Sequence, residues 1–240
     1  MRTDRRTLLV GAGLIGSGAL LAGLSPARAA RRDTEIWTFD SLRRIGGLKP
    51  RIEGAPRLID SPLGKAVAFD GANDVLFLDR HPLAGAARFT FEALFRPDGG
   101  AFEQRWFHLE SGANTDPTAK TGTRMLFEIR VEGGEWYLDT FILGPGYRQP
   151  LIVPEKRFPV GRWHHVAQSY DGTTYRAFVN GALQAEAPLA FTPQGPGRAS
   201  VGMRMNKVSP FHGAVRQAAF TRGEALARDR FVLGIPKNPV

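Results

Sequence analysis

Three oxygen-bearing side chains lie close together in the sequence at Asp70, Asn73 and Asp74. Calcium binds several carboxylate, amide and backbone oxygens that converge on one point, so this stretch is the best local candidate for a calcium site. Asp and Asn also build tight turns without a metal, because their side chains bond to the backbone a few residues on. The sequence therefore predicts either a Ca2+ site or a plain turn here, and it indicates no other cofactor.

Aromatic side chains with polar neighbours form a second candidate group. Sugar-binding sites use aromatic rings as platforms and place hydrogen-bonding groups beside them. On this basis the predicted ligand-binding residues are Trp106, His108, Trp136, Tyr147 and Arg148, with Tyr137 and Glu110 as further candidates. Packing in the core of a sheet protein is the alternative role for each of these rings.

A carboxylate pair for cleaving a glycosidic bond is not evident in the sequence. A retaining glycosidase needs two carboxyl groups about 5–5.5 Å apart. Glu128 stands alone, with Arg130 two positions on. Glu135 and Asp139 are four residues apart, which is roughly 13 Å along an extended strand. Patterns for a phosphate loop, a serine nucleophile or a zinc-binding His pair are also absent from the sequence, so no catalytic residue is predicted.

The elements that must position these residues are almost all predicted strands. Short apolar or alternating runs recur from residue 34 onward, and Met125–Val131 alternates strictly, so one face of it would be buried. Asp171-Gly172 and Asn180-Gly181 are strong hairpin signals, and they predict a three-stranded meander over Trp163–Glu186. A single short helix is expected, from Glu224 to Phe231. About a dozen strands with so little helix predict an all-β fold of two packed antiparallel sheets.

Several short motifs follow one another in an order typical of one family. They are Phe69-Asp70-Gly71, Phe89-Thr90-Phe91-Glu92-Ala93-Leu94-Phe95-Arg96-Pro97, Trp163-His164-His165-Val166-Ala167, Tyr170-Asp171-Gly172 and Val179-Asn180-Gly181. In this order they resemble the laminin-G-like branch of the concanavalin A-like lectin/glucanase superfamily, over residues 35–232. The resemblance implies an antiparallel β-sandwich of the jelly-roll type. It also implies binding of carbohydrate or protein, often with calcium.

The family pattern bears on the calcium site and on catalysis. Related pentraxins bring calcium to an Asp-Asn pair before a comparable strand, which favours Asn73 and Asp74. Laminin-G-like sequences often carry Asp-Glu in the last strand, whereas this chain has Arg216 and Gln217 there, and an Arg would repel a cation. Polysaccharide lyases of this fold use Arg, Gln, His and Tyr, and Tyr147-Arg148-Gln149 offers such residues only as neighbours in a Gly-Pro-rich loop. An enzyme acting on polysaccharide, a glycosidase or a lyase, is therefore the alternative to a binding module.

The first 29 residues have the pattern of an export signal. Arg5-Arg6-Thr7-Leu8-Leu9 resembles a twin-arginine motif, a Gly-rich apolar stretch follows, and Ala27-Arg28-Ala29 suits a signal peptidase. A general secretory signal and an uncleaved anchor are the alternatives. The sequence thus predicts a signal peptide at 1–29, one laminin-G-like domain at 30–234 and a loose tail at 235–240, in a periplasmic or secreted protein.

The net charge of +9 and the absence of cysteine narrow the function classes further. Cleavage after Ala29 lowers the charge to about +6, and the remaining Arg residues are dispersed, which argues against nucleic-acid binding. Without cysteine there is no disulfide, thiolate metal site or catalytic thiol. We expect an exported module that binds a glycan, acidic glycans included, or an extracytoplasmic protein, and that meets the membrane only through its signal before cleavage. A structural module of the cell envelope is a further alternative.

Overall fold

The computed structural model describes residues 33–112 and 122–237. The predicted signal peptide at 1–29, most of the polar segment between residues 110 and 123, and residues 238–240 of the predicted tail lie outside the described residues. Within the described ranges, no helix is both long enough and apolar enough to cross a membrane.

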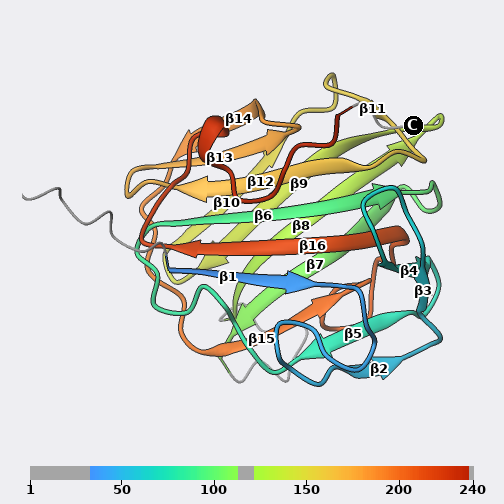
Figure 1. Cartoon of the computed structure of the whole chain (residues 1–240). Helices are drawn as coiled ribbons and strands as arrows, with labels where there is room; N and C mark the ends of the chain where they lie inside the picture. Colours follow the sequence, from blue (N-terminus) through green and yellow to red (C-terminus); the bar gives the residue numbers. More distant parts are fainter. Residues whose placement is uncertain (1–32, 113–121, 238–240) are drawn as a thin grey trace, which may run out of the picture. The chain divides into compact units, whose positions relative to one another are not determined.

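In the described part of the chain, two antiparallel sheets of eight strands each pack face to face, as Figure 1 shows with β6 and β16 in front of β7 and β8. The first sheet has the order β14-β13-β12-β6-β16-β4-β3 with β1 beside β16, and the second has the order β10-β9-β8-β7-β15-β5-β2 with β11 beside β9. The strands of the first sheet are β1 (Asp33–Thr38), β3 (Arg57–Ile59), β4 (Ala66–Asp70), β6 (Phe89–Pro97), β12 (His164–Tyr170), β13 (Thr174–Val179), β14 (Ala182–Pro188) and β16 (His212–Arg222). The strands of the second sheet are β2 (Arg51–Glu53), β5 (Val75–Leu78), β7 (Glu103–Ser111), β8 (Thr123–Glu132), β9 (Glu135–Gly144), β10 (Tyr147–Ile152), β11 (Phe158–Pro159) and β15 (Gly197–Val201). The predicted all-β sandwich is confirmed.

Alternation of side chains gives each strand an inward and an outward face. In β8, Met125, Phe127 and Ile129 are fully buried between the sheets, and the residues between them point outward. The turn between β13 and β14 places Asn180 and Gly181 at positive φ, 48° and 75°, as a tight hairpin requires. The meander β12–β13–β14 therefore forms as the two Asx-Gly pairs predicted.

Aromatic side chains fill much of the space between the sheets. Trp106 is stacked between Phe95 and Phe127, with ring centroids 4.4 Å and 5.4 Å away. Trp136 meets Phe95 edge-on at 5.0 Å, and all of these rings are fully buried. Aromatic rings bury about 150–250 Å² each, so this cluster contributes much of the stability of a chain that has no disulfides.

The predicted helix at Glu224–Phe231 is wrong, because the segment contains only a 3-10 turn, η1 (Arg228–Arg230). Side chains on the outer face of β6 hold the segment extended. Thr90 accepts a hydrogen bond from the backbone of Leu226, and Glu92 accepts two more from the backbone of Val232 and Leu233, just after the segment. An isolated helix of this length is only marginally stable in water. The hydrogen bonds to β6 therefore determine the conformation of the segment.

Tyr147, Arg148 and Gln149 lie on a strand and not in the loop that the sequence suggested. Gly144 pairs with Tyr147 across a tight turn, and β10 continues from there along the edge of the second sheet. Pro150 is tolerated in this strand because an edge strand has one unpaired side. As a result, Arg148 stands on the outer face of the sheet.

Candidate functional site

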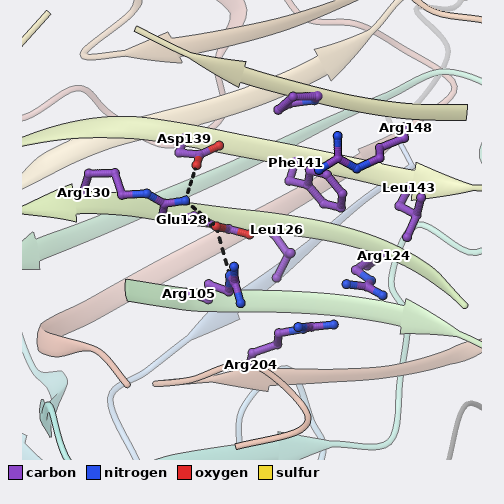
Figure 2. A pocket seen from close by; sticks show the side chains of 11 residues that line it. Arg105, Arg124, Leu126, Glu128, Arg130, Asp139, Phe141, Leu143, Arg148 and Arg204 are labelled. Atoms are coloured by element: carbon purple, nitrogen blue, oxygen red, sulfur yellow. Dashed lines mark hydrogen bonds and ion pairs between the residues drawn. The ribbon is translucent and has the colours of Figure 1, made fainter. Parts of the chain in front are cut away.

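A groove opens on the outer face of the second sheet, above β7, β8, β9 and β10 (Figure 2). Its volume is about 560 Å³. It is lined by Arg105, Arg124, Leu126, Glu128, Arg130, Asp139, Phe141, Leu143, Arg148, Pro150 and Arg204. The four strands supply all of these residues except Arg204, which comes from the loop after β15, so strand register decides which side chains meet in the groove.

Strand pairing arranges the lining residues in rows across the sheet. The arginine row consists of Arg124, Leu143 and Arg148, the apolar row of Leu126, Phe141 and Pro150, and the ion-paired row of Arg105, Glu128 and Asp139. Successive rows are two residues apart along the strands, or roughly 7 Å. Along the groove, cationic, apolar and ion-paired surfaces therefore follow one another.

In the ion-paired row, Glu128 and Asp139 face each other across β8 and β9, and arginines neutralise both (Figure 2). Arg130 lies 3.3 Å from the Glu128 carboxylate and 2.7 Å from that of Asp139, and Arg105 lies 3.1 Å from Glu128. Burial and the charge of Glu128 raise the pKa of Asp139 to about 7, although Arg130 acts in the opposite direction. Asp139 thus exchanges its proton near neutral pH.

Around the arginine row the described residues supply no acidic partner. Arg124, Arg148 and Arg204 reach into the groove, and no described carboxylate lies within ion-pairing distance of them. Burial lowers the pKa of Arg124 and of Arg204, and the charge of Arg124 lowers that of Arg204 further, whereas the more distant charges of Glu110 and Glu128 act in the opposite direction. Among the described residues, this end of the groove is therefore a cluster of arginines without an ion-pair partner.

The apolar row forms a non-polar floor between the two charged surfaces. Leu126 is buried, whereas Phe141 and Pro150 are partly exposed to the groove. The Arg148 guanidinium carbon lies 5.2 Å from the centre of the Phe141 ring, a distance at which cation and ring attract each other. The Phe141 ring is thus partly open to the middle of the groove, and the Arg148 guanidinium lies over it.

Two buried polar side chains fix the backbone that carries the arginines. Gln194 donates from its side-chain amide to the carbonyls of Arg124 and of the β9 residue paired with it, at 3.3 and 3.1 Å. Nδ1 of His108 accepts the Met205 N–H at 3.0 Å, which anchors the loop that carries Arg204. Burial lowers the pKa of His108 well below its usual value, so the ring is neutral and able to accept this bond.

The family of the chain follows from a match to a sequence model described as the concanavalin A-like lectin/glucanases superfamily, in its laminin-G form, over residues 70–227. The chain belongs to this superfamily. The match includes the four strands that form the groove, and it confirms the resemblance seen in the sequence motifs. No curated protein sequence matches the chain.

Solved structures show the same superfamily fold. Domain 4 of AbnA, an extracellular GH43 arabinanase from Geobacillus stearothermophilus, in complex with arabinotriose, aligns with a TM-score of 0.62 at 17% identity, over 83% of this chain and 96% of that one. The binding domain of botulinum neurotoxin DC in complex with SialylT aligns with a TM-score of 0.56 at 10% identity, over 82% of this chain and 49% of that one. A mutant of the NanB sialidase from Streptococcus pneumoniae aligns with a TM-score of 0.52 at 16% identity, over 64% and 25%. At these identities the likeness establishes the fold.

Three of the predicted aromatic ligand-binding residues, Trp106, Trp136 and Tyr147, lie between the sheets. Trp106 and Trp136 have no exposed surface, and the hydroxyl of Tyr147 donates to the Thr192 carbonyl at 3.1 Å. A ligand in the groove would therefore not reach these rings. Of the five predicted residues, Arg148 lines the groove, and His108 anchors the loop of Arg204 as described above.

Asp70, Asn73 and Asp74 form the turn between β4 and β5. Oδ1 of Asp70 accepts the N–H groups of Ala72, Asn73 and Asp74 at 2.8–3.2 Å, and the Asp74 carboxylate accepts those of Ala55 and Asp70. Burial acts to raise the pKa of Asp70, but these hydrogen bonds outweigh it and lower the pKa. No cluster of three His, Cys, Asp or Glu suited to a metal occurs among the described residues. The carboxylates are directed to backbone N–H groups, which is the geometry of a turn, and the Ca2+ site stays a prediction.

Sequence reasoning missed the facing pair Glu128 and Asp139 because it considered carboxyls along one strand only. The Gly133-Gly134 turn between β8 and β9 is the signal that could have found the pair. Counting outward from this turn on both strands places Glu128 opposite Asp139. For Arg204, which lies in a loop, the sequence offers no comparable signal.

Proposed function

We propose that the mature chain is an exported carbohydrate-binding module that holds a glycan in the groove above β7–β10. The observation that carries this proposal is the apolar row between two surfaces of charged side chains. A sugar ring has apolar faces and a rim of hydroxyl groups, so it suits an exposed ring face bordered by hydrogen-bond donors. Phe141 supplies the ring face, and guanidinium groups on both sides supply the donors.

The structural relatives support a carbohydrate ligand. The AbnA domain was solved with arabinotriose and the neurotoxin domain with SialylT. AbnA is an extracellular enzyme, which agrees with the export signal suggested by the first 29 residues of this chain. We therefore expect the module to act in the periplasm or outside the cell, after export by the twin-arginine route.

Cleavage of a glycosidic bond is a second candidate, favoured by the facing carboxyls Glu128 and Asp139. A carboxylic acid that keeps its proton near neutral pH beside an ionised carboxylate is the pairing that glycosidases use. Glu128, however, is ion-paired with both Arg105 and Arg130, which stabilises its charge and weakens it as a nucleophile. We expect binding without turnover, and release of new reducing ends from a bound glycan would favour the enzyme instead.

An array of plant, bacterial and animal glycans, followed by calorimetry with the strongest ligand, tests the proposal on residues 30–240. Phe141→Ala removes the ring face, and we expect the Kd to rise about tenfold. Leu183→Ala is the matched control, because Leu183 is an exposed apolar residue on β14 of the first sheet. An array without any ligand, or a Kd that Phe141→Ala leaves unchanged, would overturn the proposal.

A further inference from the structure

We propose that the glycan held in the groove is acidic, and that Arg124, Arg148 and Arg204 bind its carboxylate or sulfate ester. This inference rests on the proposed function and adds the chemical class of the ligand. The groove contains two kinds of arginine. Those of the ion-paired end, Arg105 and Arg130, are neutralised by carboxylates of the chain itself.

The other three arginines share a lack of acidic partners within the described ranges. The nearest acidic position in the strand register is Glu110, which stands opposite Arg124 in β7. Its carboxylate is occupied by Arg198 of β15, at 2.7 Å. Arg148 points outward from the edge strand with the Phe141 ring as its contact. The fold thus gathers three arginines at one end of the groove, and among the described residues Glu110 and Glu128 act on Arg124 and Arg204 only from beyond ion-pairing distance.

This arrangement is unfavourable without an anion. Nε of Arg204 is shielded from solvent and has no hydrogen-bond acceptor in the described part of the protein. A desolvated cation beside other cations is costly, and arginine does not relieve the cost by losing its proton. Charge-assisted hydrogen bonds to an oxyanion do relieve it, because the guanidinium fork matches the geometry of carboxylate, sulfate and phosphate groups.

The cluster is fixed before any ligand binds. Arg124 and Arg148 flank Leu143 at adjacent register positions, so the sheet sets their spacing. The Gln194 amide holds the Arg124 carbonyl, and the bond from Met205 to His108 holds the loop of Arg204. A preformed cluster loses little conformational entropy on binding, which is how a selective site gains affinity.

The surroundings of the cluster favour a glycan over an acidic peptide or a membrane. The apolar row lies beside the arginine row, so a sugar ring stacked on Phe141 would direct its acidic substituent towards Arg124 and Arg148. At the other end of the groove, roughly 13 Å away along the strands, Arg105 and Arg130 are already paired with Glu128 and Asp139, so that end attracts an anion less strongly than the arginine row does. The groove therefore selects both the charge of the ligand and its direction.

Two pairs of probes distinguish the effect of a glycan's charge on binding from the effect of its sugar backbone. They are oligogalacturonate against its methyl ester, and sulfated dextran oligosaccharides against unmodified ones. In one pair we expect the charged member to bind at least about tenfold more tightly, with an affinity that falls as salt is added. Preference within the first pair identifies a carboxylate ligand, and preference within the second identifies a sulfate ester.

Single Arg→Gln substitutions then test the three arginines by calorimetry. Arg124→Gln, Arg148→Gln and Arg204→Gln should each raise the Kd for the acidic probe about tenfold, and by clearly more than they raise the Kd for its neutral counterpart. Arg148→Gln is the decisive variant, because Arg148 is exposed and its loss leaves the core intact. Arg57→Gln, at an exposed position of β3 in the first sheet, removes the same charge elsewhere and serves as the control.

The outcomes separate this inference from the proposed function. If neutral glycans bind through Phe141 and none of the three arginines affects any probe, the inference fails and the proposed function stands. If no glycan binds at all, both fail. Equal effects of Arg148→Gln and Arg57→Gln on the acidic probe would also overturn the inference, as would equally tight binding of poly-glutamate.

Discussion

Asp139 lies in the groove where β8 and β9 meet, and it shares Arg130 with Glu128. The charged groups that face it are Glu128, Arg130, Arg105 and Glu103. Burial and the charge of Glu128 raise its pKa from the ordinary 3.8 to about 7. Between these two values the folded protein holds a proton that the unfolded chain has released. The group therefore stabilises the fold at low pH, and this contribution is lost as the pH rises through 7.

Asp139→Asn should remove this pH dependence while keeping the size of the side chain. Between pH 5 and 8, we expect the wild type to lose about 2–3 kcal/mol of unfolding free energy relative to the variant. Urea unfolding of both proteins at several pH values measures the difference. Asp60→Asn, at an exposed position, is the control, and parallel pH profiles of wild type and Asp139→Asn would contradict the raised pKa.

Asp70 is the residue on which the turn between β4 and β5 depends, because one oxygen accepts three backbone N–H groups. Asp70→Ala should lower the unfolding free energy by about 1–3 kcal/mol, whereas the exposed control Asp60→Ala should have little effect. Millimolar calcium should leave the Tm of the wild type unchanged. A rise in Tm with calcium that Asp70→Ala abolishes would contradict a turn-only role and favour the predicted metal site.

At this scale, residue type identified candidates but did not decide their roles. A tryptophan such as Trp106 suits a sugar-binding platform and a hydrophobic core equally well. Which role it has depends on whether its side chain points outward from the sheet or inward between the sheets. Its strand contains a bulge between Arg105 and Phe107, which turns both Trp106 and Phe107 inward. Such a bulge breaks the alternation from which faces are predicted. Arg148 was predicted for a binding site and lines the groove, although its strand was not expected.

Among the elements, the segment that joins β14 to β15 supports the arginine row through one buried side chain. Gln194 is 1% exposed and bonds to the carbonyls of Arg124 and Leu143 and to the hydroxyl of Tyr147. Nε2 of His81 donates a hydrogen bond to the side-chain oxygen of Gln194 at 3.1 Å. One amide thereby links β8, β9 and β10 at the cationic end of the groove.

Gln194→Ala should therefore lower the unfolding free energy by about 2–3 kcal/mol and weaken ligand binding, because buried carbonyls lose their donor. Hydrogen exchange followed by mass spectrometry should show faster exchange in β8, β9 and β10. Gln184→Ala is the matched control, since the Gln184 side chain bonds only to the nearby Ala182 carbonyl. Equal rates of hydrogen exchange in β8, β9 and β10 of both variants would show that Gln194 does not stabilise the strands that carry the arginine row.

Elements defined by local patterns were predictable, and elements defined by distant partners were not. Alternation and Asx-Gly turns sufficed for β8 and for the β12–β14 meander. The segment after Gly223 reads as a short helix, but its backbone bonds to Thr90 and Glu92, far away in sequence. The groove arises in the same way, since its rows exist only once the strands are in register.

At the scale of the whole domain, and within residues 33–112 and 122–237, a segment of the chain crosses the outer face of the first sheet, whereas the groove lies on the outer face of the second. The C-terminal segment crosses the first sheet, where the Phe231 ring lies 4.9 Å from that of His165 and 5.4 Å from that of Phe178. The groove lies on the second sheet. The net charge of +9 thus matters less than its placement, because three arginines without an ion-pair partner among the described residues are concentrated in the groove. The dispersed pattern of Arg in the sequence did not reveal this concentration.

A crystal structure of the mature chain with the oligosaccharide that binds most tightly would show directly where the glycan lies. We expect a sugar ring against Phe141, with an acidic substituent within hydrogen-bonding distance of Arg124, Arg148 and Arg204. A ligand bound at the turn of Asp70 or on the first sheet, with an empty groove, would contradict this expectation.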